Sequence, residues 1–417
     1  MIKKNPIYFI FVLALSVRLA FVLFFPPLYA ADTGQFDDIA LSLTKGNGFS
    51  LSSGISTAAR PPVYPLFLAG IYSLFGQSHL AVKLAQAILG AISCIIIYLI
   101  GKEVFNRKIG LWSGVAMALY PPLISTTGFI LSEELAIFLL AITILFLTRA
   151  MKRKQVSCYI LAGIFLGLTT LCRPITLLFP FFLYPAFLFS SSKRREFVWI
   201  SILLASMILT ITPWTIRNYI KFNAFISGQT GRGVILWAGT HLPADGPGGM
   251  PYGVTSAHKE YKDPGDGEAF LKVGEGLSAV EADKAYYREG IKNILNNPSG
   301  YLRLCLEKFK RFWFWIPGGV EVLKPYPKIK LGITAIYFSM LLLAVWGVWG
   351  GLKENWRDKL PMLAIISYFT IMHTLIFAIP RFRLPIMPYV LIFAVVGFLQ
   401  LLDRRMKILL QSQKGVV

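Results

Sequence analysis

The stretch IYFIFVLALSVRLAFVLFF at residues 7–25 decides the class of fold, because it is long and apolar enough to cross a bilayer. The alternative is a cleaved signal peptide over residues 1–31. Its apolar core would usually span only about 7–15 residues, and Tyr29 is too large for the small position before a cleavage site. We therefore expect residues 7–25 to remain as a first membrane span.

The rest of the chain repeats this apolar pattern. Of the 417 residues, 55% are hydrophobic and only 15% are charged, and the mean hydropathy is +0.60. Further segments of spanning length lie near 79–101, 109–126, 129–149, 157–172, 174–190, 197–213, 330–350, 360–379 and 384–402. The sequence therefore predicts an all-α integral membrane protein with about ten transmembrane helices.

The net charge of +21 does not indicate nucleic-acid binding, because the basic residues come as short clusters between apolar segments. If the N-terminus lies inside, these clusters all return to the same side, at 102–108, 149–154, 193–195, 353–359 and 404–407. Such clusters are typical of cytoplasmic loops beside anionic lipid. We expect a multi-pass protein of the cytoplasmic (inner) membrane, with membrane lipid and no nucleic acid among its partners. The four cysteines have no paired spacing and indicate packing rather than a disulfide framework or a metal site.

Two loops that face outward in this topology are long. The loop 26–78 contains the apolar stretch VYPLFLAGIYSLF, which is too short to span and is expected to be an interfacial or re-entrant helix. The segment 214–329 is glycine-rich before a helical pattern returns from Val280 to about Trp313, and it predicts a small mixed extracytoplasmic cap. The chain is thus divided into an N-terminal transmembrane catalytic module at 1–213, the cap at 214–329 and C-terminal transmembrane helices at 330–417.

Acidic residues stand at two outer turns. Asp32 follows the first span, and a carboxylate there can act as a general base toward a hydroxyl, although a helix N-cap is the alternative. Asp37 is an ordinary surface charge or a substrate contact. Glu133 and Glu134, in FILSEELAIFLL, either favour a helix N-terminus that Ser132 caps or contact a substrate across a cavity.

Arginines also stand at the outer ends of spans, where Lys and Arg are normally rare. They are Arg60, Arg173, Arg217, Arg381 and Arg383. A guanidinium forms bidentate bonds with phosphate, so the set predicts a site for a lipid phosphate. The alternative for each one singly is that it reaches toward the outer headgroups. Arg18, in the middle of the first span, is costly there unless it faces a cavity or a partner.

Other candidate residues carry less information. Trp237 is a candidate for stacking on a sugar face. His241 and His258 lie in the long outer segment, and no spacing around them indicates a metal site. The run from Phe312 to Trp315 is typical of an aromatic belt at the membrane interface.

In their order along the chain, several stretches resemble the GT-C glycosyltransferases, in the branch of the protein O-mannosyltransferases and the lipid A aminoarabinose transferases. They are ADTGQFDDIALSLTKGNGF, ARPPVYPLFLAGIYSLFG, LSEELAIFLL, LCRP, TPWTIRNYIKFNAF, LWAGT, EADKAYYREGIKNILNNPSGYLRL and IPRFRLPIMPYVLIFA.

The resemblance implies a GT-C architecture and a polyprenyl-phosphate sugar donor. It implies that Asp32 is the catalytic aspartate, that Arg60 contacts the donor phosphate and that Glu133 is the acid of the second outer loop. Arg217 and Arg381 would help to hold the phosphate or the cap. Ala59 precedes Arg60 where the aminoarabinose branch has an acidic residue and then Lys before Pro-Pro. This departure leaves a divalent cation, and lipid A as acceptor, open.

The function expected from the sequence is therefore transfer of a sugar from a polyprenyl-phosphate donor to an envelope lipid or glycan, at the outer face of the membrane. Transfer to protein is a variant of this hypothesis. A flippase or transporter of a lipid-linked saccharide is the alternative. Transporters, however, place ionisable residues near the bilayer midplane and often carry repeats, whereas these charges gather at outer ends and no repeat is visible.

Overall fold

The structure is a computed structural model that describes residues 5–25, 32–51, 54–184, 193–240, 273–315, 327–352 and 355–414. Within these ranges the chain is almost entirely helical, and one isolated bridge joins Ser50 to Ser56. The expected all-α class is confirmed. His241 and His258 lie outside the described residues.

The first half of the chain forms eleven of the helical segments. They are α1 (Pro6–Phe24), α2 (Thr33–Thr44), α3 (Val63–Phe75), α4 (His79–Val104), α5 (Arg107–Leu119), α6 (Pro121–Ser125), the 3-10 turn η1 (Thr126–Gly128), α7 (Glu133–Arg153), α8 (Val156–Cys172), the 3-10 segment η2 (Pro174–Leu178) and α9 (Phe179–Phe182).

The second half adds the cap and the C-terminal helices. They are α11 (Lys193–Phe222), α12 (Arg232–Thr240), α14 (Ala279–Asn296), α15 (Pro298–Phe314), α16 (Pro327–Leu352), α17 (Trp356–Leu375), the 3-10 segment η4 (Pro380–Ile386) and α18 (Met387–Lys414). The expected mixed cap is helical in its described part, which comprises α12, α14 and α15.

In the part of the chain that the structure describes, six helical segments are long and apolar enough to cross a membrane, and a seventh is reached if one bent pair counts as a single span. The six are Pro6–Phe24, His79–Val104, Glu133–Arg153, Arg194–Phe222, Leu331–Gly351 and Pro380–Asp403, and the bent pair is Arg107–Leu119 with Pro121–Gly128. The expected number of about ten is not confirmed. The predicted span 157–172 is a shorter apolar helix. The described part of 174–190, residues 174–184, contains the short segments η2 and α9, each with a proline in its first turn.

The helix α11 runs past the predicted end of its span. Pro213 lies inside it, yet the helix continues to Phe222. The boundary expected between residues 213 and 214 therefore falls within a helix, and Arg217 is a helical residue rather than a loop residue.

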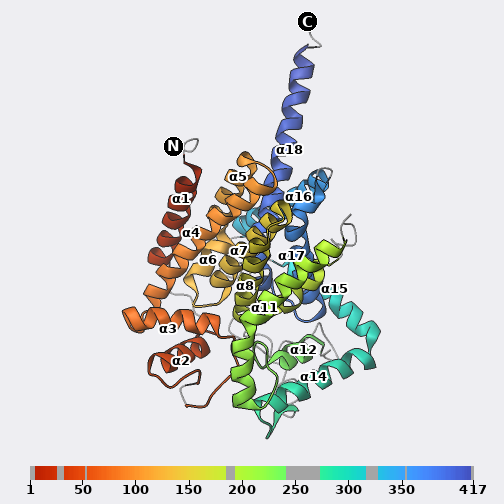
Figure 1. Ribbon diagram of the computed structural model, residues 1–417. Helices are drawn as coiled ribbons and strands as arrows, with labels where there is room; N and C mark the ends of the chain where they lie inside the picture. Colours follow the sequence, from red (N-terminus) through yellow and green to blue (C-terminus); the bar gives the residue numbers. More distant parts are fainter. Residues whose placement is uncertain are drawn as a thin grey trace.

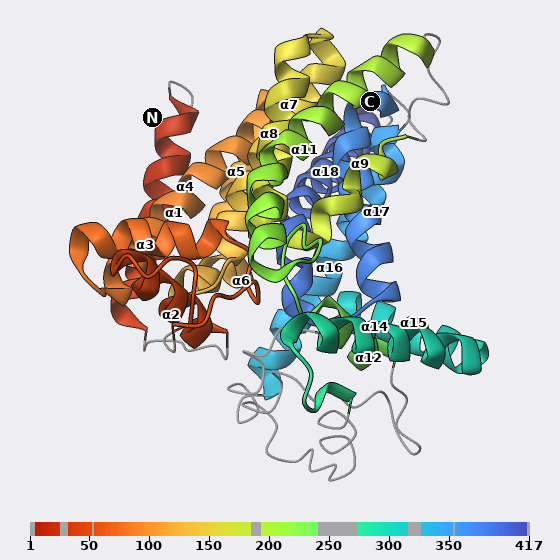
Figure 2. The ribbon, with the colours of Figure 1, turned by 60° about the horizontal axis from the view of Figure 1, so that its bottom comes forward.

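The bundle has two different ends (Figures 1 and 2). At one end the Lys152 ammonium lies 3.4 Å from Asp358 and donates to the carbonyl of Glu103, so three of the predicted basic clusters meet there. At the other end, α2 and α3 lie crosswise to α1 and α4, and α12, α14 and α15 lie beside one another below the long helices. The short helix α3 fits the prediction of a non-spanning helix in the first outer loop.

The core between these ends is made by closely packed helices. Its buried residues come mainly from α4, α7, α8, α17 and α18. The pair α16 and α18 approaches so closely that a Cβ at Gly347 would lie 1.9 Å from the carbonyl oxygen of Phe393. This rigid bundle supports the elements that carry the site.

Candidate functional site

A large cavity of about 2300 Å³ opens where α1, the α5–α6 corner, α16 and η4 face the cap helix α12. Most of its wall is apolar, including Val17 and Phe21 on α1 and Tyr337 and Met340 on α16. Its charged groups are few, and five of them form one group, which we call the charged cluster: Asp32, Arg60, Glu133, Arg173 and Arg381. A space of this kind suits a ligand with one anionic group and a long apolar part.

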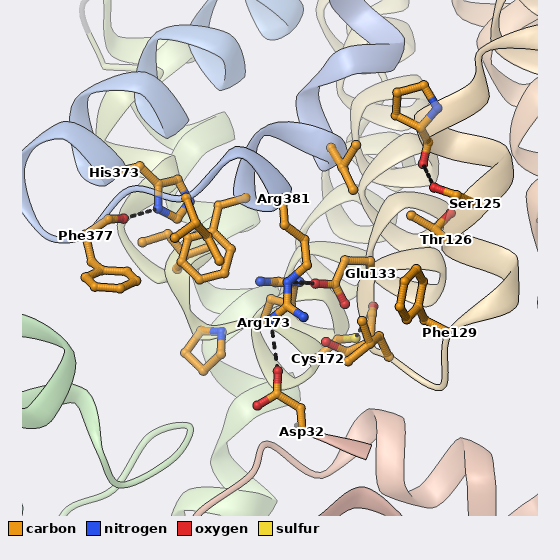
Figure 3. A pocket seen from close by; sticks show the side chains of 18 of the residues that line it. Asp32, Ser125, Thr126, Phe129, Glu133, Cys172, Arg173, His373, Phe377 and Arg381 are labelled. Atoms are coloured by element: carbon orange, nitrogen blue, oxygen red, sulfur yellow. Dashed lines mark hydrogen bonds and ion pairs between the residues drawn. The ribbon is translucent and has the colours of Figure 1, made fainter. Parts of the chain in front are cut away.

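Asp32 lies at the start of α2 and is bound by two arginines. Its Oδ1 accepts a hydrogen bond from Arg60 Nη2 at 2.7 Å, and its Oδ2 accepts one from Arg381 Nη2 at 2.9 Å. Asp32 occupies the N-cap position of α2, but its side chain makes no capping hydrogen bond. The helix-cap alternative is therefore excluded, and the carboxylate faces the cavity (Figure 3).

Glu133 begins α7 and forms the second acidic point of the charged cluster. Its Oε1 lies 2.8 Å from Arg173 Nη1 and 3.0 Å from Arg381 Nε, and only 2% of its side chain is exposed. Arg381 therefore lies between the two carboxylates, as Figure 3 shows. Three guanidiniums face two carboxylates, so the charged cluster keeps an excess of positive charge.

The arginines are held by their local sequence. Arg60 precedes Pro61 and Pro62 at the start of α3, and its guanidinium binds Gln35 Oε1 at 2.8 Å and lies 5.0 Å from the centre of the Phe36 ring. Prolines fix the backbone dihedral φ and so limit where the preceding residue can point. Gln35 and Phe36 lie on the first turn of α2, three and four residues after Asp32, so Arg60 connects the two sides of the first outer loop.

Arg173 and Arg381 share an aromatic neighbour. Arg173 stands between the end of α8 and Pro174, and Arg381 follows Pro380 in η4. The ring centre of Phe382 lies 5.4 Å from the guanidinium carbon of Arg173 and 5.9 Å from that of Arg381. Cation–π contacts of this kind orient a guanidinium without neutralising it.

The charged cluster controls the ionisation of Asp32. Partial burial alone would raise the pKa of its carboxyl, but the guanidiniums of Arg60 and Arg381 outweigh burial and hold that pKa below its ordinary value. Asp32 is therefore ionised in the unliganded protein and is a weak base while both arginines bind it.

Arg217 and Arg383, which were also predicted to bind phosphate, lie outside the charged cluster. Arg217 donates to the carbonyls of Thr57 and Phe49 at 2.8 and 2.9 Å, so it attaches the first outer loop to α11. Arg383 is 1% exposed, donates to the carbonyl of Phe312 and lies 4.7 Å from the centre of the Tyr337 ring. Neither side chain lines the cavity.

The three predicted substrate contacts also lie off the cavity wall. Asp37 accepts a hydrogen bond from the Tyr72 hydroxyl at 2.6 Å and lies 2.8 Å from His79 Nε2. Glu134 is buried beside Arg18, which does not face lipid but is fully buried. Trp237 packs edge-on against Tyr286 with ring centres 5.7 Å apart.

The aromatic run before α16 is only partly a belt. Phe314 and Trp315 are 47% and 56% exposed, but Phe312 is fully buried and stacks on His373 with ring centres 5.4 Å apart. The expectation of an interfacial position is therefore wrong for Phe312, because α15 turns that residue toward α17.

Several residues of the cavity wall are not among those predicted from the sequence, and one of them is Arg232. This arginine starts α12, lines the cavity and donates to Ser227 Oγ at 3.1 Å and to the Gln229 carbonyl at 3.2 Å. The neighbouring Thr230 amide donates to the Ala58 carbonyl at 2.8 Å, which places the cap beside the loop that carries Arg60. Arg232 stands in the run GQTGRG, and its charge in a glycine-rich outer segment was the available signal.

The described residues contain no group of three or more His, Cys, Asp or Glu side chains arranged to hold a metal ion. The two carboxylates that line the cavity, Asp32 and Glu133, are both in contact with arginines. Nothing in this donor set favours a cation over the guanidiniums, so no step proposed below runs through a metal.

Comparison with known proteins finds one matching family model and several similar solved structures. Residues 59–216 match the family model described as dolichyl-phosphate-mannose-protein mannosyltransferase. No curated protein matches the sequence.

Solved structures are similar over the whole chain. The archaeal oligosaccharyltransferase AglB from Archaeoglobus fulgidus, in its apo form, has a TM-score of 0.59 at 14% identity, covering 100% of this chain and 52% of AglB. The same protein with an inhibitory peptide and a dolichol-phosphate gives 0.55 at 14% identity, with the same coverage. The chain thus spans about half the length of AglB. ArnT from Cupriavidus metallidurans bound to undecaprenyl phosphate gives 0.45 at 12% identity, covering 94% of this chain and 76% of ArnT.

The likeness to AglB concerns the fold, and the ArnT score is too low to add to it. The family model covers the segment from the first outer loop to α11, which includes Arg60, Glu133 and Arg173 of the charged cluster. The chain therefore shares the fold of AglB, and the resemblance to GT-C glycosyltransferases expected from its sequence is confirmed.

Proposed function

We propose that this protein is a membrane glycosyltransferase that takes a sugar from a polyprenyl-phosphate donor and transfers it to a lipid or glycan of the cell envelope. The observation that carries the proposal is the charged cluster, in which Arg60 and Arg381 bind the two oxygens of Asp32 at 2.7 and 2.9 Å at the wall of the large apolar cavity. Such a wall accommodates isoprenoid units, and the guanidiniums suit a phosphate.

Asp32 is the catalytic residue of this proposal. The oxygen of the acceptor hydroxyl attacks the anomeric carbon, the bond from that carbon to the phosphate oxygen breaks, and the phosphate leaves with the electron pair. The hydroxyl proton passes to Asp32. A single displacement of this kind inverts the anomeric configuration.

The arginines have two tasks in this scheme. They bind the donor phosphate and stabilise the charge that grows on it as it leaves, and one well-placed donor of this kind contributes about 3 kcal/mol. The donor phosphate also competes with Asp32 for Arg60 and Arg381. Once the guanidiniums turn to the phosphate, the Asp32 carboxylate loses its counter-charges and becomes a stronger base.

The difference between the two ends of the bundle supports a proposal for the side of the membrane on which the site lies. Lys152 and its neighbours mark one end, and the other end carries α2 and α3, at whose starts Asp32 and Arg60 lie. Because Lys and Arg clusters stay in the cytoplasm, we assign the site to the outer face of the inner membrane.

The test uses purified protein in liposomes with a radiolabelled polyprenyl-phosphate sugar and an envelope lipid extract as acceptor. Formation of a labelled glycosidic product and release of polyprenyl phosphate is the expected result. Movement of intact donor across the bilayer without a new product would instead support the alternative of a flippase. Peptides are added as acceptor in a parallel reaction, and transfer of label to them alone would point to protein as the acceptor.

A further inference from the structure

A second group of polar side chains is buried behind the charged cluster, and the proposed reaction does not use it. We call it the inner cluster, and it consists of Arg18 on α1, Thr126 on η1 and Glu134 on α7. Arg18 is 0% exposed, Glu134 1% and Thr126 6%. Charged groups are rarely buried in this way unless they face a partner.

Gly90 on α4 makes room for the inner cluster. A Cβ at position 90 would lie 2.3 Å from Glu134 Oε1 and 2.4 Å from Arg18 Nε. The carboxylate and the guanidinium therefore both lie over this glycine, where α1, α4 and α7 come together. Any larger residue at position 90 would push one of the two charged groups away.

Arg18 depends on Glu134 for its charge balance. Its Nη1 donates to the Ala14 carbonyl of its own helix at 3.3 Å, while Nε and Nη2 have no hydrogen-bond partner within the described part of the chain. Glu134 is the carboxylate that faces it and attracts it electrostatically. Removing the charge of Glu134 would leave a buried cation without compensation.

The inner cluster is connected to the site in two ways. Glu134 directly follows Glu133, and successive helical residues point about 100° apart, so fixing Glu134 also fixes the direction of Glu133. The Thr126 hydroxyl donates to Glu134 Oε2, and Thr126 lines the cavity. Ser132 at the N-cap of α7 gives no capping hydrogen bond, so these contacts hold the start of the helix instead.

We propose that Arg18 and Glu134 are positioning residues, which hold the start of α7 so that Glu133 keeps Arg173 and Arg381 in place for an anionic headgroup. This inference rests on the proposed function for the identity of the ligand. Neither residue touches the cavity, so the effect passes through Glu133 and the arginines.

The experiment measures the affinity of the purified protein for undecaprenyl phosphate in nanodiscs, together with thermal unfolding of the same samples. We expect Glu134→Gln to bind about tenfold more weakly than the wild type. Gly90→Ala, which leaves every charge in place, should weaken binding in the same direction. The matched controls are Glu103→Gln at the opposite end of the bundle and Gly332→Ala, where an added Cβ meets nothing within 4 Å.

A double variant separates positioning from a purely structural role. Arg18→Met with Glu134→Met removes both buried charges together, so thermal stability should return toward the wild-type value. Affinity for undecaprenyl phosphate should stay low, because nothing then orients the start of α7. Recovery of stability and affinity together would overturn the proposal, as would wild-type affinity in Gly90→Ala. If Glu134→Gln fails to fold, the other two variants give the answer.

The result also separates this inference from the proposed function. If the wild type binds undecaprenyl phosphate and the variants bind it with equal affinity, the positioning role is refuted but the proposed function is not. Absence of binding by the wild type refutes the proposed donor. In that case a cryo-EM map of Gly90→Ala decides, because displacement of Glu133 from Arg173 supports the inference and an unchanged ion pair rejects it.

Discussion

Asp32 and Glu133 share Arg381, which lies 2.9 Å from one carboxylate and 3.0 Å from the other. This sharing links the first outer loop, the start of α7 and η4 into one charged cluster. A ligand phosphate that takes over Nη2 of Arg381 would release the contact of this nitrogen with Asp32. The proposed reaction depends on this exchange, in which the donor phosphate replaces Asp32 as the partner of Arg60 and Arg381.

Replacing Asp32 by Asn should abolish transfer without unfolding the protein. The amide cannot accept the proton of the acceptor hydroxyl, and loss of a general base typically costs about 10²–10⁴-fold in rate. The measurement is the initial rate of glycoside formation with radiolabelled donor. Asp37→Asn, the same change on the same helix but off the cavity wall, is the control and should retain activity within a few-fold. Near-normal transfer by Asp32→Asn would end the catalytic assignment.

The pH dependence should differ between the free protein and the complex. The pKa of Asp32 is lowered in the free protein, so the acid limb of kcat/KM should lie below the ordinary carboxyl value of about 3.9. In the complex the phosphate binds the arginines in place of Asp32, so the pKa of Asp32 should rise. The acid limb of kcat should therefore lie at higher pH than that of kcat/KM. Identical acid limbs for kcat and kcat/KM would argue against the exchange of partners.

The same lowered pKa affects stability in a defined direction. Because the folded-state pKa of Asp32 lies below its unfolded value, its contribution to stability is present above the unfolded pKa. It is lost as the pH falls through the folded-state pKa.

Much of the site could be predicted from residue type and position. Arg60, Arg173 and Arg381 stand beside prolines at the outer ends of helices, and all three reach the charged cluster. Arg383 could not be separated from Arg381 in sequence. Two residues further along η4 its side chain turns inward to the Phe312 carbonyl, and this direction is set by packing with α15.

At the scale of elements, the first outer loop is held by α11 and by the cap. Arg217 donates to the carbonyls of Phe49 and Thr57 and lies over the Trp214 ring, with its guanidinium carbon 4.9 Å from the ring centre. The loop then continues through Ala58, which accepts from the Thr230 amide, to Arg60. The position of Arg60 thus depends on contacts far away in the sequence.

Arg217→Met should therefore lower stability and weaken donor use together. It removes charged hydrogen bonds to two carbonyls, and we expect a loss of about 1–3 kcal/mol in the free energy of unfolding, with a raised KM for the donor. Thermal unfolding and steady-state kinetics measure the two effects. Arg153→Met, in an exposed ion pair with Glu103, is the matched control. If Arg217→Met had wild-type stability and KM, the contacts of Arg217 with Phe49 and Thr57 would not be needed to position Arg60.

Helix boundaries could be predicted only where composition changes sharply. The helices α2 and α3 follow the apolar pattern of residues 33–43 and 63–75. By contrast, α11 passes Pro213 without ending, whereas residues 174–182 form only the short segments η2 and α9, each with a proline in its first turn. A proline marks a weak point in a helix, but tertiary packing decides whether the helix ends there.

At the scale of the whole molecule, we predict that the end of the bundle with the charged cluster faces outward. Lys45 lies at the end of α2 on the side of the site, and Lys154 lies in the basic cluster after α7; both are exposed. The four natural cysteines are buried, so a single introduced cysteine can be labelled selectively. A membrane-impermeant maleimide should label Lys45→Cys in intact cells and Lys154→Cys only after permeabilisation. The opposite pattern would place the site in the cytoplasm.

The number of spans was harder to predict than their orientation. Hydropathy identifies apolar segments of spanning length, but it does not show that α8 is short or that α5 and α6 bend by 57°. The orientation can be predicted without these details, because the basic clusters identify the cytoplasmic side by their charge alone.

A structure of the protein with undecaprenyl phosphate bound would test directly whether the phosphate displaces Asp32 from the arginines. We predict that the phosphate lies within hydrogen-bond distance of Arg60 and Arg381 and that the Asp32 carboxylate no longer binds both of them. The isoprenoid chain should follow the apolar wall of the cavity. A headgroup bound away from these arginines, with the ion pairs of Asp32 intact, would contradict it.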